Sequence, residues 1–236
     1  EQGIEKSVID SLISESISYV HEIDQIFSTY KESSEVSRIR RGELHISEAT
    51  SIVQEIWRRC EIARELTDGA FDPFQERLGG FDPSGYVKGW AADRLADMAA
   101  AVGITRLHIN AGGDLTLRGG LDDLQPWMIG IQHPKKAGSI AAVIPIRDGA
   151  VASSGTYERG AHIYDSSNNS IAIGALATSV YGPDGGLADA LATALMVAGR
   201  DGAPWFLKPE LAEYGCWVVN RHEDTTWSIR WPEQQK

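Results

Sequence analysis

The sequence contains little cysteine and no long apolar run. Its 236 residues include two cysteines, Cys60 and Cys216, in neither a CxxC nor a CxxH pattern. This excludes a disulfide-rich scaffold and a cysteine zinc site, and we expect two buried free thiols. No apolar stretch approaches the roughly 20 residues that a membrane-spanning helix needs. Residues 1–27 are too polar for a signal peptide. We therefore expect a soluble chain without an integral membrane segment, either cytoplasmic or exported after loss of a signal upstream of Glu1.

Basic residues are also scarce. Lysine and arginine number 22 and aspartate and glutamate 33, so the formal net charge is −11. A field of this sign repels phosphate backbones, which argues against nucleic acid and anionic membranes as partners, although a few local cations can still hold a small anionic ligand. The length corresponds to one large domain or two intimately associated halves, and we treat residues 1–236 as a single domain.

Hydrophobic spacing predicts helices in the first half of the chain. The predicted helices cover residues 8–27, 47–66 and 88–102, and the polar segment 28–41 reads as a loop. From Arg106 onward the apolar period changes to two, which indicates strands. The predicted strands cover residues 107–109, 115–117, 127–131, 140–146, 150–153, 162–164, 172–181, 216–220 and 226–231.

Two further signals complete this prediction. Asp148-Gly149 is a hairpin signal between two of the strands, and a fourth helix opens at Asp184 and closes at Gly199. Helices followed by strands, then a helix and more strands, predict the α+β class, with mainly antiparallel sheets and packed helices.

The fourth predicted helix carries the most informative polar pair. Residues 187–198 contain only two polar side chains, Asp189 and Thr193, and the spacing of four places both on one helix face. A buried carboxylate needs a partner, and an oxygen-only donor pair suits Mg²⁺. The alternative is structural: Asp189 would accept backbone or arginine hydrogen bonds, and Thr193 would bond back within its own helix.

Three other segments could contact a ligand. Residues 81–89 place Lys88 near a helix N-terminus, where phosphate is favoured, although taken by itself the segment fits a Pro-Ser-Gly turn with a solvated lysine better. Residues 110–114 (NAGGD) allow close approach of a ligand, but a plain hairpin turn needs the same residues and is better supported. His162 suits proton transfer near neutral pH, yet a lone histidine is more often structural. The aromatic residues Tyr30, Trp57, Trp90 and Tyr164 could stack on a ring or belong to the core.

Taken together, these segments resemble the ApbE family, the FAD:protein FMN transferases. Eight motifs occur in the family's order: 27–39 (FSTYKESSEVSRI), 67–73 (TDGAFDP), 82–89 (DPSGYVKG), 110–114 (NAGGD), 126–134 (PWMIGIQHP), 151–159 (VASSGTYER), 162–165 (HIYD) and 187–193 (LADALAT). Each motif alone is weak, but the ordered set covers nearly the whole chain.

The resemblance implies an activity and a set of site residues. Family members bind FAD with Mg²⁺ and pass its FMN half to a threonine or serine hydroxyl of an acceptor protein, releasing AMP. By position, Asp189, Thr193 and the Gly85 carbonyl match the Mg²⁺ ligands, and Asp189 and His162 match the residues of the transfer step. The positions around the flavin nucleotide are matched by Tyr30, Ala70, Phe71, Asp72, Asp82, Lys88 and Tyr164.

The chain departs from the family pattern at four points. Only residues 74–81 separate two motifs that are usually far apart, Arg40 replaces a frequent asparagine, residues 166–169 replace a common Pro and Thr-Gly, and an early Met-Gly-Thr strand is missing. Two alternative functions stay open at this point: an FAD-binding carrier or sensor without transfer, and an FAD pyrophosphatase that yields FMN and AMP.

Overall fold

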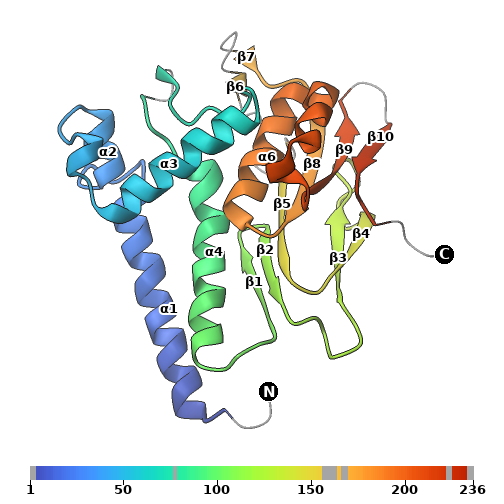
Figure 1. The fold of residues 1–236 in the computed structure, drawn as a ribbon, viewed down its shortest axis with the longest axis horizontal. Coiled ribbons are helices and arrows are strands. Elements are labelled where there is room, and N and C mark those ends of the chain that lie inside the picture. The colour runs from blue at the N-terminus through green and yellow to red at the C-terminus, as the bar shows by residue number, and fades with distance from the viewer. Residues whose placement is uncertain (1–3, 77–78, 156–163, 166–169, 222–224, 233–236) are drawn as a thin grey trace.

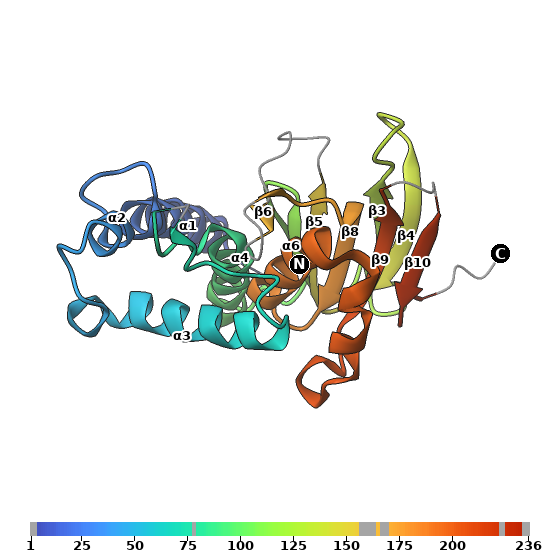
Figure 2. The same ribbon diagram turned by 90° about the horizontal axis from the view of Figure 1, so that it is seen from above.

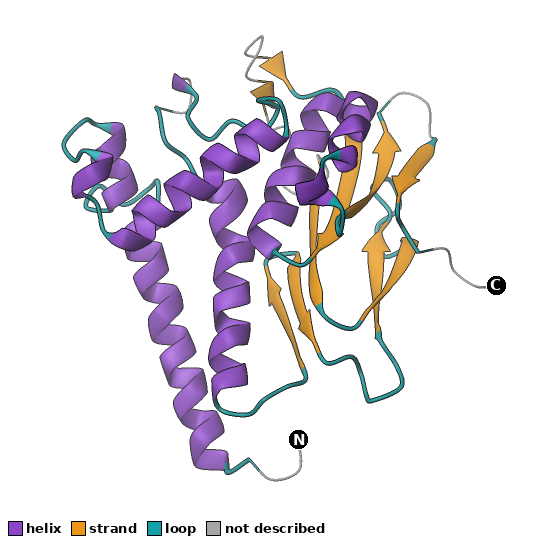
Figure 3. Ribbon diagram, viewed as in Figure 1, coloured by secondary structure: helices purple, strands orange, loops and turns teal. Residues whose placement is uncertain are grey.

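The helices and strands form an α+β arrangement, as predicted. A computed structural model describes residues 4–76, 79–155, 164–165, 170–221 and 225–232. Helices cover one face of a six-stranded sheet, and a two-stranded hairpin packs against the other face (Figures 1 and 2). Figure 3 shows the helices gathered on the left of the view and most of the strands on the right.

The helical layer agrees with all four predicted helices and adds a fifth α-helix, α2. Its α-helices are α1 (Lys6–Phe27), α2 (Glu35–Arg40), α3 (Ser51–Leu66), α4 (Ser84–Ala101) and α6 (Gly185–Ala198), and its 3₁₀ segments are η1 (Ile46–Glu48), η3 (Gly199–Leu207) and η4 (Pro209–Leu211). The loop predicted for residues 28–41 is wrong where α2 forms. Ser34 caps that helix by accepting a hydrogen bond from the Ser37 backbone N–H at 3.0 Å, and Val36 is buried beneath it.

Antiparallel pairing connects every strand of the main sheet. The order is β1 (Leu107–Ala111), β2 (Asp114–Arg118), β5 (Gly149–Gly155), β8 (Ala175–Gly182), β9 (Gly215–Asn220) and β10 (Thr226–Ile229). The separate hairpin consists of β3 (Trp127–Gln132) and β4 (Ile140–Ile146), and the short strands β6 (Tyr164–Asp165) and β7 (Ser170–Ile171) pair with each other. The predicted strand over residues 162–164 is therefore described only at Tyr164.

The hairpin predicted at Asp148-Gly149 is wrong, because the flanking strands belong to different sheets. β4 pairs with β3, whereas β5 pairs with β2 and β8. Gly149 has a φ of +138°, a conformation that favours glycine, and the Asp148 carboxylate accepts a hydrogen bond from the Gly119 N–H at 2.9 Å. The turn signal is real, but it directs the chain from the small sheet into the large one.

Close contact between α4 and α6 organises the centre of the molecule. A Cβ atom added to Gly89 would lie 2.2 Å from the carbonyl oxygen of Gly185, and one added to Gly186 would lie 2.4 Å from the ring of Tyr86. Glycine at these positions lets the two helix backbones approach each other. The same approach sets the first half of α4 beside α6, whose residues Ala188 to Met196 are almost all buried.

Both cysteines are free and buried, as expected from the sequence. Burial raises the pKa of the Cys60 thiol, and it raises the pKa of Cys216 to about 12. Because the thiolate is the reactive form, both side chains should stay protonated and unreactive in the native protein at pH 8. We expect iodoacetamide to label neither residue by mass spectrometry over an hour, and both after unfolding in guanidinium chloride. Rapid labelling of the native protein would contradict this burial.

Candidate functional site

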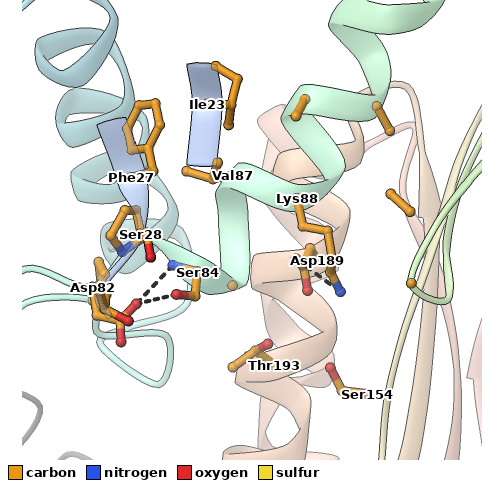
Figure 4. A pocket seen from close by; sticks show the side chains of 18 of the residues that line it. Ile23, Phe27, Ser28, Asp82, Ser84, Val87, Lys88, Ser154, Asp189 and Thr193 are labelled. Carbon is orange, nitrogen blue, oxygen red and sulfur yellow. Dashed lines mark hydrogen bonds and ion pairs between the residues drawn. The ribbon is translucent and has the colours of Figure 1, made fainter. Parts of the chain in front are cut away.

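A cavity of about 610 Å³ opens between the helical layer and the end of the sheet. Figure 4 shows side chains from α1, α4, α6 and β5 around it. Nine residues predicted from the sequence line this cavity: Tyr30, Ala70, Phe71, Asp72, Asp82, Gly85, Lys88, Asp189 and Thr193. His162 lies outside the described residues, and Tyr164 is placed only as backbone of β6. The structure thus brings together most of a site whose members are widely separated in sequence.

The predicted metal-binding pair lies on α6 at the floor of the cavity. The Asp184 side chain caps this helix by accepting a hydrogen bond from the Leu187 N–H at 2.8 Å, and Asp189 is 4% exposed. Gly85 adjoins Thr193, because a Cβ atom added to Gly85 would lie 3.5 Å from Thr193 Oγ1. Within the described ranges no three His, Cys, Asp or Glu side chains form a metal cluster. The available donors are therefore a carboxylate, a hydroxyl and backbone oxygens, a hard set that fits Mg²⁺ and does not suit zinc.

Lys88 pairs with two buried carboxylates. Its Nζ atom lies 2.5 Å from Asp114 Oδ2 and 3.9 Å from Asp189 Oδ2, and Figure 4 shows the lysine directed at Asp189. The sequence prediction placed Lys88 at a helix start, but α4 begins at Ser84 and Lys88 lies in its second turn. The ammonium lies close to both carboxylates and is nearer to Asp114, which shows that this corner accommodates positive charge.

Asp114 is the site residue that our sequence prediction missed. Its side chain is 2% exposed, in the last position of the NAGGD motif and the first of β2. That motif forms the predicted hairpin turn, with φ values of +63° at Gly112 and +102° at Gly113. It also contacts the cavity, which Ala111 and Gly112 line. The signal in the sequence was an aspartate directly after a glycine turn. That signal does not reveal the partner of Asp114, because Lys88 lies on α4.

The start of α4 is fixed by Asp82. Asp82 Oδ1 accepts hydrogen bonds from the Ser84 backbone N–H at 3.0 Å and from Ser84 Oγ at 2.5 Å (Figure 4). On the other motif, Asp72 Oδ1 accepts the Phe74 N–H at 3.0 Å and lies 3.2 Å from Arg64 Nε. These carboxylates therefore shape the turns that present Phe71 and Gly85 to the cavity.

The short segment between these motifs is closed by aromatic packing. The Trp57 ring centroid lies 4.6 Å from that of Phe74 and 4.7 Å from that of Phe81, and the Asp82 N–H donates to the Pro73 carbonyl at 2.7 Å. A Cβ atom on Gly79 would lie 2.9 Å from an Arg40 guanidinium nitrogen, so Arg40 covers this segment. Two departures from the family pattern, the short segment and Arg40, thus pack against each other.

An apolar wall faces the polar corner across the cavity. It is formed by Val20, Ile23, Phe27, Val87, Ala91 and Leu95, from α1 and α4. Tyr30 lies at the rim and is 95% exposed. Trp90 instead packs edge-on against Phe27, with ring centroids 6.3 Å apart, and is 3% exposed. Of the aromatics considered for stacking, Trp90 belongs to the core and Trp57 is half-buried against it, whereas Tyr30 is available to a ligand.

Comparisons with known proteins agree with this geometry. The family model described as "ApbE family" matches residues 3–79 and 75–217. The chain is 36% identical over 132 residues to an FAD:protein FMN transferase of Rhodobacter capsulatus, and 33% identical over 153 residues to one of Escherichia coli K12. These matches span 52% and 59% of this chain but only 25% and 43% of the relatives, so the chain covers less than half of either protein.

Solved structures extend the similarity over the whole fold. The ApbE protein of Thermotoga maritima superimposes with a TM-score of 0.83 at 23% identity, covering 98% of this chain and 92% of that one. The flavin transferase ApbE of Vibrio cholerae gives a TM-score of 0.80 at 22% identity, covering 97% and 90%. At these identities the structures establish the shared fold. Fold, motif order and family match agree, and the chain belongs to the ApbE family.

Proposed function

We propose that this protein is a Mg²⁺-dependent FAD:protein FMN transferase that attaches the FMN half of FAD to a threonine or serine hydroxyl of an acceptor protein and releases AMP. One observation carries the proposal: residues from six of the eight motifs, among them Tyr30, Lys88 and Asp189, line a single cavity. Curated relatives in the same family are named for this activity.

The polar corner supplies a place for the cation. Asp189, Thr193 and the backbone of Gly85 would hold Mg²⁺, which when bound would neutralise pyrophosphate charge and favour departure of AMP. Lys88 adds a second positive charge beside Asp189. A chain of net charge −11 needs such local cations before it can bind a pyrophosphate.

The remaining walls would orient the dinucleotide. Val20, Ile23 and Phe27 offer an apolar surface to an aromatic ring, and exposed Tyr30 can pack over the ligand at the rim. In the transfer, the acceptor oxygen forms a bond to the FMN-side phosphorus as the bond from that phosphorus to the AMP oxygen breaks. We assign His162, on the segment that follows cavity-lining Gly155, to accept the hydroxyl proton. Positioning and electrostatics supply most of the rate.

The direct experiment is to incubate the protein with FAD, Mg²⁺ and an acceptor peptide. The peptide is taken from an acceptor protein of a related transferase and contains a single threonine. We expect covalent FMN on the peptide by mass spectrometry, with one AMP released for each modified peptide. The same peptide with valine in place of threonine is the control and should stay unmodified. Free FMN and AMP without modified peptide would indicate a pyrophosphatase, and bound but unreacted FAD would indicate a carrier. Either result would contradict transfer.

His162→Ala adds an arm to this assay. If His162 accepts the proton, the variant should bind FAD with near wild-type affinity and transfer FMN at a strongly reduced rate. His108→Ala is the matched control, because His108 lies on the edge strand β1 and is exposed. Equal rates for the two variants would remove His162 from the reaction.

A further inference from the structure

Two buried carboxylates share the Lys88 ammonium, and they do so unequally. Asp114 Oδ2 lies 2.5 Å from Nζ and Asp189 Oδ2 lies 3.9 Å from it. Both oxygens are almost inaccessible to solvent. The attraction between opposite charges grows as the distance between them falls, so of these two carboxylates Asp114 holds the ammonium more strongly. Asp189, which would bind the metal, holds the ammonium only weakly.

Asp114 is itself fixed on the side away from the lysine. Its Oδ1 atom accepts a hydrogen bond from the Ser153 backbone N–H at 3.3 Å, which ties it to β5. Its backbone closes the β1–β2 hairpin opposite Ala111. The cavity is lined by Lys88 and by Asp189 but not by Asp114, within the part of the chain that the structure describes. Asp114 is therefore placed to act on a ligand through Lys88.

The unequal sharing matters for a cation at Asp189. A lysine ammonium that bonds directly to Asp189 would occupy the oxygen a divalent cation needs and would repel that cation. Without the charge of Asp114, Lys88 would lose its nearer carboxylate and would pair more closely with Asp189, because that buried carboxylate lies only 3.9 Å from the ammonium and a buried charge favours a close counter-ion.

We propose that Asp114 is a positioning residue that holds the Lys88 ammonium away from Asp189 and so keeps that carboxylate available to a divalent cation. The inference rests on the proposed function, which supplies the reason for a divalent cation at Asp189. It can nevertheless be tested by measuring cation binding without the transfer reaction. It assigns a role to a residue that is not among the described residues lining the cavity.

The test is Mn²⁺ binding in the presence of FAD, followed by electron paramagnetic resonance, in wild type, Asp114→Asn, Lys88→Gln and the double variant. We expect Asp114→Asn to weaken Mn²⁺ binding by about tenfold or more, because the ammonium then pairs with Asp189. In the Lys88→Gln background the same substitution should change the affinity by about threefold or less, since no ammonium remains to be held.

A simple loss of negative charge or of packing would weaken binding equally in both backgrounds, and that result would overturn the inference. So would a wild-type protein that binds no Mn²⁺ at millimolar concentration. If Asp114→Asn does not fold, Asp114→Glu replaces it: the longer side chain pushes the ammonium towards Asp189, so binding should weaken only where Lys88 is present.

Asp93→Asn is the matched control. Asp93 is a buried carboxylate that joins α4 to β2 and α6, accepting hydrogen bonds from Thr116 Oγ1 at 2.9 Å and from the Gly185 N–H at 2.7 Å. Its effect on Mn²⁺ affinity should be the same in both Lys88 backgrounds. If the protein transfers FMN but the effect of Asp114→Asn on Mn²⁺ affinity does not depend on Lys88, the role of Asp114 is rejected and the proposed reaction stands. If the effect depends on Lys88 but no FMN is transferred, the proposed reaction is rejected and the role of Asp114 stands.

Discussion

Replacing Asp189 by alanine is expected to reduce FMN transfer by about a thousandfold or more while leaving the protein folded. Asp189 is the carboxylate of the oxygen donor set on α6 and the one acidic residue within that helix. A neutral residue there removes the charge that would hold Mg²⁺, and a loss of this size corresponds to about 4 kcal/mol of transition-state stabilisation. Lys88 keeps its ion pair with Asp114, so no buried charge is left uncompensated.

The measurement is the initial rate of peptide flavinylation at saturating FAD across a range of Mg²⁺ concentrations. Circular dichroism and the melting temperature should match those of wild type. Asp201→Ala, which removes an exposed carboxylate from η3, is the control for the change in net charge and should transfer normally. Transfer by Asp189→Ala within about threefold of wild type would show that the cation binds elsewhere.

The second large effect is expected from Gly89→Ala. The added methyl group would lie 2.2 Å from the Gly185 carbonyl oxygen, and neither backbone can yield without separating α4 from α6. We expect a loss of about 2–3 kcal/mol of stability from this overpacking, although alanine favours a helix over glycine by about 1 kcal/mol. Because Lys88 and Asp189 lie on the two separated helices, FAD binding should weaken as well.

Urea unfolding of the variant, read by tryptophan fluorescence, measures the loss. Ala100→Gly is the matched control, since Ala100 lies exposed on the same helix. It should lose about 1 kcal/mol from helix propensity alone and leave FAD binding unchanged. A Gly89→Ala protein as stable as wild type would mean that the close approach of the helices is not required.

The sequence predicts a helix correctly where the capping residues and the helical spacing of apolar residues indicate the same segment. α6 begins after Asp184 and ends before Gly199, as its sequence indicates. α2 was missed because a short helix with few apolar residues has little periodicity, and its stability comes from the Ser34 cap and buried Val36. The turn at Asp148-Gly149 was recognised, but a turn residue encodes a change of direction and not the sheet that receives the next strand.

The site could be predicted only through the order of its motifs. Asp189 and Thr193 stand out because they are polar in a buried helix. Asp114 and Lys88 lie on a strand and a helix, and their pairing depends on how α4 crosses β2. The roles of Arg40 and Trp57 likewise arise from packing across elements. Contacts of this kind depend on tertiary geometry, which no local spacing encodes.

The composition of the cavity wall also constrains how the protein is made. Among the described residues, its lining begins at Val20 on the first helix and ends at Thr193 on α6. A nascent chain that has emerged as far as β5 has the apolar wall and Lys88 but lacks the carboxylate floor. Ligand binding therefore cannot assist the early stages of folding during synthesis. Ligand binding can stabilise the protein only after α6 has packed against the rest of the fold, because a ligand stabilises only the state that binds it.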